Sequence, residues 1–167
     1  MSQTELIMEF LGGEKAFRVT HAHGKISGQT RKRAASRGAS PPEFATDIQL
    51  VDLLRAGLPY TAFESATEHL SVSVEELSRA LGLKLRTLAR RRHESRLSQT
   101  ESERTLRLAR VFARASEVLG TSTAAREWVR MPNGALGGRP PLGLLDTDVG
   151  SGAVLDVLGR IEHGVIG

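Results

Sequence analysis

The sequence feature that most restricts the fold is a group of small and apolar residues spaced around Gly82. In a helix-turn-helix unit, two short helices pack against each other across a tight turn. The residues expected in that contact are Leu77, Ser78, Leu81, Leu83 and Leu88. A left-handed backbone conformation at Gly82 costs little because glycine has no β-carbon. The pattern therefore predicts a helix-turn-helix between Val74 and Arg92.

The second helix of this unit, from Lys84 to about Glu94, is strongly basic. We expect it to turn Leu85, Leu88 and Ala89 inward and to place its N-terminal half in the major groove of DNA. Arginine can pair with guanine through two hydrogen bonds, and phosphates attract any cation. The residues assigned to base edges are Arg86, Thr87 and Arg90. Those assigned to phosphates are Lys84, Arg91, Arg92 and Arg96.

Charge is distributed unevenly along the chain. Between Lys84 and Arg114 there are ten Lys and Arg residues against three Glu, whereas residues 132–167 carry two Arg against four acidic residues. A basic helix is most often only a solvated face, but here it coincides with the apolar spacing of a helix-turn-helix. A basic middle and an acidic end indicate two different partners, one of them polyanionic. A single unit seldom gives enough affinity, so we expect a homodimer on a two-fold operator.

The rest of the chain has helical rather than alternating periodicity, which predicts an all-α fold. Ser73 with Glu76, and Ser98 with Glu101, have the spacing of a capping box at a helix start. Pro59 is placed to open another helix, and Ser122 is the expected cap of the helix after Gly120. The predicted helices besides the helix-turn-helix pair are 47–56, 59–70, 98–119, 123–131 and 151–163.

The N-terminal region divides into two unlike parts. An apolar cluster within residues 1–13 could form a helix that docks either on a partner or on the main body. Residues 21–42 are rich in Gly, Ser, Arg and Lys, which predicts a flexible basic linker or arm. We therefore divide the chain into an N-terminal arm, 1–45, a DNA-binding domain, 46–115, and a C-terminal domain, 116–167.

Composition excludes several classes of function. The chain has no cysteine and no apolar run long enough to cross a membrane, which favours a cytoplasmic protein without membrane contact. No nucleophile elbow, phosphate-binding loop or zinc-binding helix motif is present, and the five histidines are scattered. We expect no catalytic residue, no metal site and no cofactor. The nearest alternative is a plain transcriptional regulator whose C-terminal domain dimerises or binds a ligand.

From about Leu58 onward the sequence resembles the Xre/MbcA/ParS antitoxin family. The resemblance is carried by the segments TLARRR (87–92), ESER (101–104), RLARV (107–111), AAREW (124–128), PNGALGG (132–138), LLDT (144–147) and GRIEHG (159–164). It implies a type II antitoxin that binds a RES-domain toxin, a class that destroys NAD, and that represses its own operon in a larger toxin–antitoxin assembly. The resemblance also implies that the C-terminal third binds the toxin.

A short tail could neutralise such an enzyme by entering its NAD pocket. We expect Arg160, Glu162, His163, Gly164 and Val165 to cap the entrance. Leu142, Leu144 and Leu145 are assigned to the toxin-facing surface, with the protein core as the alternative that the sequence leaves open. Trp128 is expected in the core, and Gly134 to Gly138 are expected to shape a turn rather than to bind phosphate.

Overall fold

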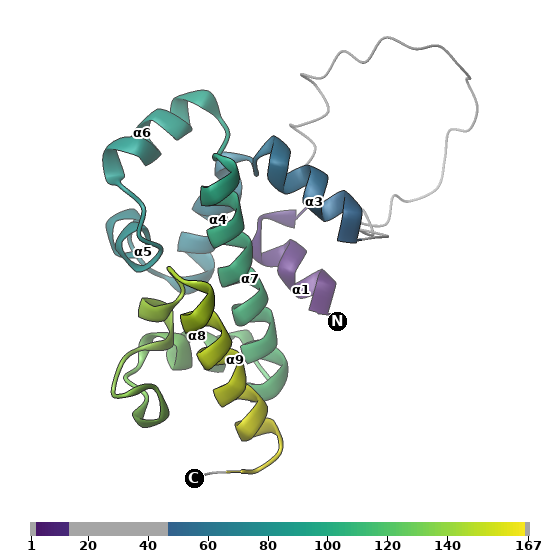
Figure 1. The fold of residues 1–167 in the computed structure, drawn as a ribbon, viewed down its shortest axis with the longest axis vertical. Coiled ribbons are helices and arrows are strands. Elements are labelled where there is room, and N and C mark those ends of the chain that lie inside the picture. The colour runs from purple at the N-terminus through teal and green to yellow at the C-terminus, as the bar shows by residue number, and fades with distance from the viewer. Residues whose placement is uncertain (1–2, 14–46, 166–167) are drawn as a thin grey trace, which may run out of the picture.

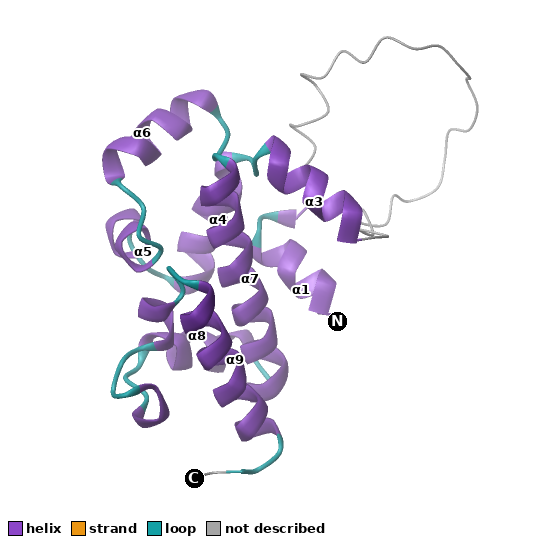
Figure 2. Cartoon of the chain, in the orientation of Figure 1, coloured by secondary structure: helices purple, strands orange, loops and turns teal. Residues whose placement is uncertain are grey.

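The computed structural model describes residues 3–13 and 47–165, and its regular structure there is entirely helical, which confirms the all-α prediction (Figures 1 and 2). The predicted basic linker, 21–42, lies outside the described residues. The elements are α1 (Gln3–Phe10), α3 (Asp47–Ala56), α4 (Tyr60–Leu70), α5 (Val74–Ala80), α6 (Leu85–Glu94), α7 (Gln99–Leu119), α8 (Ser122–Arg130), η2 (Gly134–Leu136), η3 (Pro141–Leu144) and α9 (Asp148–Glu162). No helix within the described ranges is long and apolar enough to span a membrane.

Helix α7 is the central element of the molecule, and α1, α3, α4, α8 and α9 all pack against it (Figure 1). It begins with the complete capping box of Ser98 and Glu101, as predicted, and ends at Gly120 in the left-handed conformation. Its apolar residues Leu108, Val111 and Phe112 are buried. The proposed division between residues 115 and 116 falls inside this helix, so the two halves of the chain share one continuous spine.

Helix α1 docks on the main body, which decides between the two alternatives for the N-terminal cluster. Phe10 and Leu11 are each 1% exposed, and the ring of Phe10 lies 4.7 Å from that of Phe112 on α7. The Ser65 hydroxyl donates a hydrogen bond of 2.9 Å to the Phe10 carbonyl. Met8, Phe10 and Leu11 therefore belong to the core, although more than thirty residues that are not described separate them in sequence from α3.

Two predicted helix starts need correction, and a third is right in position but shows half of its predicted capping box. Helix α8 is capped by Thr121 rather than by Ser122, because the Thr121 hydroxyl accepts the Ala124 N–H. Helix α9 begins at Asp148, before the predicted start at Ser151, with Thr147 as its cap. At α5 the Ser73 side chain accepts the Glu76 N–H, which is one half of the predicted capping box. Adjacent hydroxyl residues satisfy the same capping rule, and only the backbone path selects between them.

The loop between α8 and α9 is shaped by its glycines, as predicted. Gly137 and Gly138 both have positive φ, and the Asn133 side chain accepts the Ala135 N–H at 2.9 Å. Trp128 is half-buried and packs against the core. Further along, a β-carbon on Gly150 would lie 1.9 Å from the Leu144 carbonyl oxygen, so α9 can approach η3 only at a glycine.

Candidate nucleic-acid and partner interfaces

The predicted helix-turn-helix is present as α5, a turn and α6. Gly82 has φ +60°, the left-handed conformation expected from sequence, and Leu77, Leu81 and Leu88 are buried between the helices. Helix α7 braces the turn, since the Arg104 guanidinium donates to the carbonyls of Leu81 and Gly82 at 2.9 and 2.8 Å. The unit is therefore held by the spine as well as by its own leucines.

The inward face of α6 is narrower than predicted. Leu88 is its one buried residue, whereas Leu85 is 47% exposed and Ala89 is also exposed. The prediction that Leu85 and Ala89 turn inward is wrong, because α6 lies at the outside of the molecule and buries only Leu88 (Figure 1). Its exposed surface combines these two apolar residues with basic ones.

Four of the residues assigned to DNA lie exposed on or next to α6. Lys84 stands at the N-cap and Arg86 follows in the first turn. Arg90 and Arg92 extend this basic surface toward the C-terminus, and each approaches one carboxylate, Arg90 that of Glu94 at 3.5 Å and Arg92 that of Glu64 at 3.7 Å. Thr87 is half-buried. Ion pairs this exposed are weak, so these arginines can exchange them for phosphate or base contacts.

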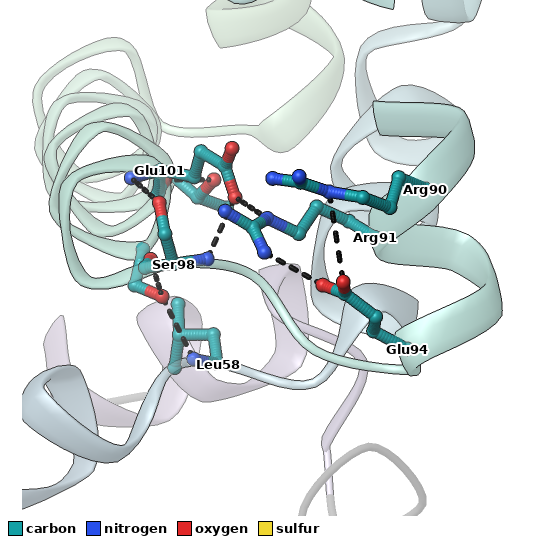
Figure 3. A network of polar contacts seen from close by, with 8 residues as sticks. Leu58, Arg90, Arg91, Glu94, Ser98 and Glu101 are labelled. Carbon is teal, nitrogen blue, oxygen red and sulfur yellow. Dashed lines mark hydrogen bonds and ion pairs between the residues drawn. The ribbon is translucent and has the colours of Figure 1, made fainter. Parts of the chain in front are cut away.

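Arg91 has a different environment from its neighbours (Figure 3). Its guanidinium donates to Glu94 at 2.6 Å and to Glu101 at 2.8 Å, and its side chain is only 19% exposed. The hydrogen bond to Glu94, followed by the bond to Glu101, raises the pKa of Arg91 against the opposing effect of burial. The group that we expected on a phosphate thus ties α6 to the first turn of α7.

Arg96 is also engaged within the chain. It donates to the carbonyls of Ala56 and Gly57 at 3.1 and 3.0 Å, which closes the C-terminal end of α3. Beside it, the Leu97 N–H donates to the Leu58 carbonyl at 2.9 Å, and the Leu58 N–H donates to Ser102 at 2.8 Å. Of the seven residues assigned to DNA, Arg91 and Arg96 therefore position the α6–α7 corner.

Two of the leucines assigned to the toxin-facing surface belong to the core. Leu142 is 5% exposed and Leu145 is fully buried, and Leu144 is half-buried against the same core. The expectation that Leu142 and Leu145 are exposed is wrong, because the η3 segment packs against α8 and α9, although Leu142 still lines a groove beside α8. The alternative that the sequence left open, burial in the core, is the one observed.

The other residues assigned to toxin binding lie at the C-terminal end of α9. Arg160 and His163 are exposed, and Val165 is 60% exposed. Gly164 takes φ +67°, and the Val165 and Gly164 N–H groups bond back to the carbonyls of Arg160 and Ile161. These two bonds form a Schellman motif that stops the helix.

Glu162 is tied to the spine. It pairs with Arg114 of α7, and this hydrogen bond is the main cause of the raised pKa of Arg114. Near the start of α9, Asp148 pairs with Arg107 at 2.5 Å. Two ion pairs therefore join the acidic helix α9 to basic residues of α7.

A groove that the sequence did not reveal lies between α5 and the α8–η3 region. Its volume is about 660 Å³. We call it the α5–α8 groove, and its lining includes Arg79 and Ala80 of α5, Arg126, Arg130 and Met131 of α8 and its C-cap, and Leu142 of η3. The groove brings together arginines of two helices that are distant in sequence, so the sequence could not predict it. Its one local sign in the sequence is the spacing of Arg126 and Arg130 by one helical turn.

The described histidines do not form a metal site. In the described ranges, 3–13 and 47–165, no group of three or more His, Asp or Glu side chains is placed to hold a metal ion. The His69 ring lies 5.3 Å from that of Phe10, and its Nδ1 lies 2.9 Å from the Ser65 carbonyl oxygen. His93 and His163 are exposed.

Two family models match successive parts of the chain. Residues 49–110 match the antitoxin Xre-like helix-turn-helix domain. Residues 114–164 match the antitoxin Xre/MbcA/ParS C-terminal toxin-binding domain. The junction between the two matches lies within α7, at the region where the structure joins its two halves.

Three curated relatives have similar sequences over most of their length. The protein named Antitoxin Xre of Yersinia enterocolitica is 36% identical over 138 residues, which are 81% of this chain and 93% of the relative. Antitoxin Xre of Photorhabdus laumondii is 30% identical over 116 residues, covering 68% and 78% of the two chains. The Prs ADP-ribosylating antitoxin of a Sphingobium species is 26% identical over 148 residues, covering 80% and 93%.

Proposed function

The chain belongs to the Xre/MbcA/ParS family of antitoxins, and on that premise we propose that it neutralises a RES-domain toxin that consumes NAD and represses the operon encoding both. The single observation that carries this proposal is the match of residues 114–164 to a toxin-binding domain, on a helical unit joined to a helix-turn-helix through α7. The proposed domains are 46–115 for DNA and 116–167 for the toxin. The proposed compartment is the cytoplasm.

Support for an NAD-consuming toxin comes from one relative. The name of the Sphingobium protein connects it with ADP-ribosylation, a reaction in which the ADP-ribose group is drawn from NAD. A toxin that either hydrolyses NAD or transfers its ADP-ribose would contain a pocket for the dinucleotide. Such a pocket can be closed by a short protein segment.

We assign the blocking segment to the C-terminal end of α9. Arg160, His163 and Val165 are exposed there, and the Schellman motif at Gly164 ends the helix beside them. Glu162 is held by Arg114, which orients the last turn of α9 on the spine. A chain ending at Ile161 should bind the toxin but leave NAD consumption unblocked, and full silencing by that chain would refute the blocking role.

We assign DNA recognition to the exposed surface of α6. Lys84, Arg86, Arg90 and Arg92 are available for contacts, and Thr87 lies beside them. A homodimer would place two such helices on successive turns of the major groove, one on each half-site. Repression would follow if this operator overlaps the promoter of the toxin and antitoxin genes.

The test that separates this proposal from a plain transcriptional regulator is co-expression. The antitoxin should restore growth and cellular NAD in cells that make the toxin encoded beside it, whereas a plain regulator should restore neither. A matched control is a chain with Arg86→Ala and Arg90→Ala, which should lose operator binding but still rescue growth. Rescue that disappears with these two substitutions would mean that protection works through repression alone.

A further inference from the structure

The α5–α8 groove contains cationic groups that the folded chain leaves unpaired. Arg79 and Arg126 form no hydrogen bond or ion pair with any residue that the structure describes. Arg130 approaches Glu76 at 4.0 Å and the Ser71 carbonyl at 3.4 Å, and both contacts are long. The groove therefore has more positive charge than its own carboxylates neutralise.

The Nε atom of Arg126 is buried beside this groove without a hydrogen-bond partner in the described part of the chain. A buried donor without a partner costs free energy, and native proteins rarely keep one without a reason. A carboxylate entering the groove would accept from the Arg126 guanidinium in a charge-assisted hydrogen bond.

The other walls of the groove are apolar. Ala80, Pro140 and Leu142 line it, and Met131 at its edge is 62% exposed. A flexible, exposed methionine beside arginines is typical of the core of a protein interface. The carboxylates of Glu76 and Glu127 also line the groove, so its lining carries three arginines against two glutamates. This small positive excess, together with the apolar walls, matches a single carboxylate on an apolar protein segment better than the polyanionic backbone of DNA.

From these observations, and resting on the proposed antitoxin function, we propose that the α5–α8 groove binds an acidic side chain carried on an apolar segment of the toxin. Arg126 and Arg79 pair with the carboxylate, and Met131 covers the neighbouring apolar residues. Helix α5 lies in the part of the chain that matches the helix-turn-helix domain, and α8 lies in the part that matches the toxin-binding domain. The toxin-binding surface therefore extends beyond the C-terminal domain onto the first helix of the DNA-binding unit.

The experiment uses the full chain and the toxin encoded beside it, with affinity measured by calorimetry. Arg126→Met should weaken toxin binding by about tenfold or more, because it removes one partner of a desolvated charge pair. Its melting temperature should equal or exceed that of the wild type, since the substitution removes a donor that the free chain leaves unpaired. Arg79→Met, an exposed position, provides a second variant with little risk to folding.

The matched control is Arg55→Gln on α3, an arginine whose side chain is 69% exposed and which lies outside the lining of the groove. It should bind the toxin as the wild type does. Equal toxin affinities of Arg126→Met, Arg79→Met and this control would overturn the inference while leaving the antitoxin function intact. A loss of DNA affinity without a loss of toxin affinity would overturn it in favour of a phosphate contact. Failure of the wild type itself to bind the toxin would instead overturn the proposed function.

Discussion

Arg91 and Ser98 share one oxygen atom of Glu101. The Arg91 Nε donates to this Oε2 at 2.8 Å and the Ser98 N–H donates to it at 2.6 Å (Figure 3). The carboxylate that caps α7 is therefore also the anchor of α6. Arg104, one turn further along α7, holds the turn between α5 and α6. The spine thus fixes the helix-turn-helix at both ends of its second helix.

This shared carboxylate predicts a stability effect at Glu101. Glu101→Gln should lower the free energy of unfolding by about 1–3 kcal/mol. The substitution removes the charge of a buried carboxylate and so weakens its hydrogen bonds with Arg91 and Ser98. Chemical denaturation of the two proteins measures the difference. Glu103→Gln, at an exposed position on the same helix, is the control and should have little effect. Equal stabilities of the two variants would argue against the anchor.

The different environments of Arg91 and Arg92 predict different salt dependences of DNA binding. Arg92→Ala should lower the slope of log affinity against log salt by about one, as expected for the loss of one phosphate contact. Arg91→Ala should leave that slope unchanged, because its guanidinium is held by Glu94 and Glu101. Fluorescence anisotropy on operator DNA over a salt series would check this. A reduced salt dependence of DNA binding in the Arg91 variant would mean that Arg91 does contact a phosphate.

Tyr60 predicts a loss of stability at alkaline pH. Burial, followed by the nearby Glu64 carboxylate, raises the pKa of Tyr60 above its ordinary value of 10.0, and its side chain is almost fully buried. The neutral phenol therefore favours the folded state, so this stability is complete below the ordinary pKa and is lost as the pH rises through the raised one. Because the chain has one tyrosine, phenolate absorbance reports this group alone. Tyr60→Phe should make alkaline unfolding less steep, and an unchanged pH profile would contradict the assignment.

The glycines of α9 predict opposite effects of the same substitution. Gly150→Ala should destabilise the fold by about 1–3 kcal/mol, as overpacking does, because its β-carbon would meet the Leu144 carbonyl. Gly152→Ala should stabilise it by about 0.5–1 kcal/mol, since alanine is the better helix former and the space there is open. Thermal denaturation of both variants tests the pair. Stabilisation by both would mean that α9 does not pack closely on η3.

Much of the local structure could be predicted from the sequence because it depends on neighbouring residues. The capping box at Ser98, the turn at Gly82 and the stop of α7 at Gly120 are each decided by a few adjacent side chains and by backbone freedom. The choice of Thr121 over Ser122 as a cap was missed, because both side chains can accept the same kind of hydrogen bond. Periodicity indicated where the helices lie but could not select between neighbouring caps.

Periodicity, capping and charge are local properties, so an all-helical chain with a basic helix-turn-helix and an acidic end can be predicted from the residues. How the charged and apolar side chains are used depends instead on which distant segments pack together. Arg91 and Arg96 have the same chemistry as Arg86, yet long-range contacts with Glu101 and with the α3 carbonyls engage them within the fold. Leu142 and Leu145 are buried in the core, and Arg79 and Arg126 line the same groove, because burial and proximity are properties of the folded chain.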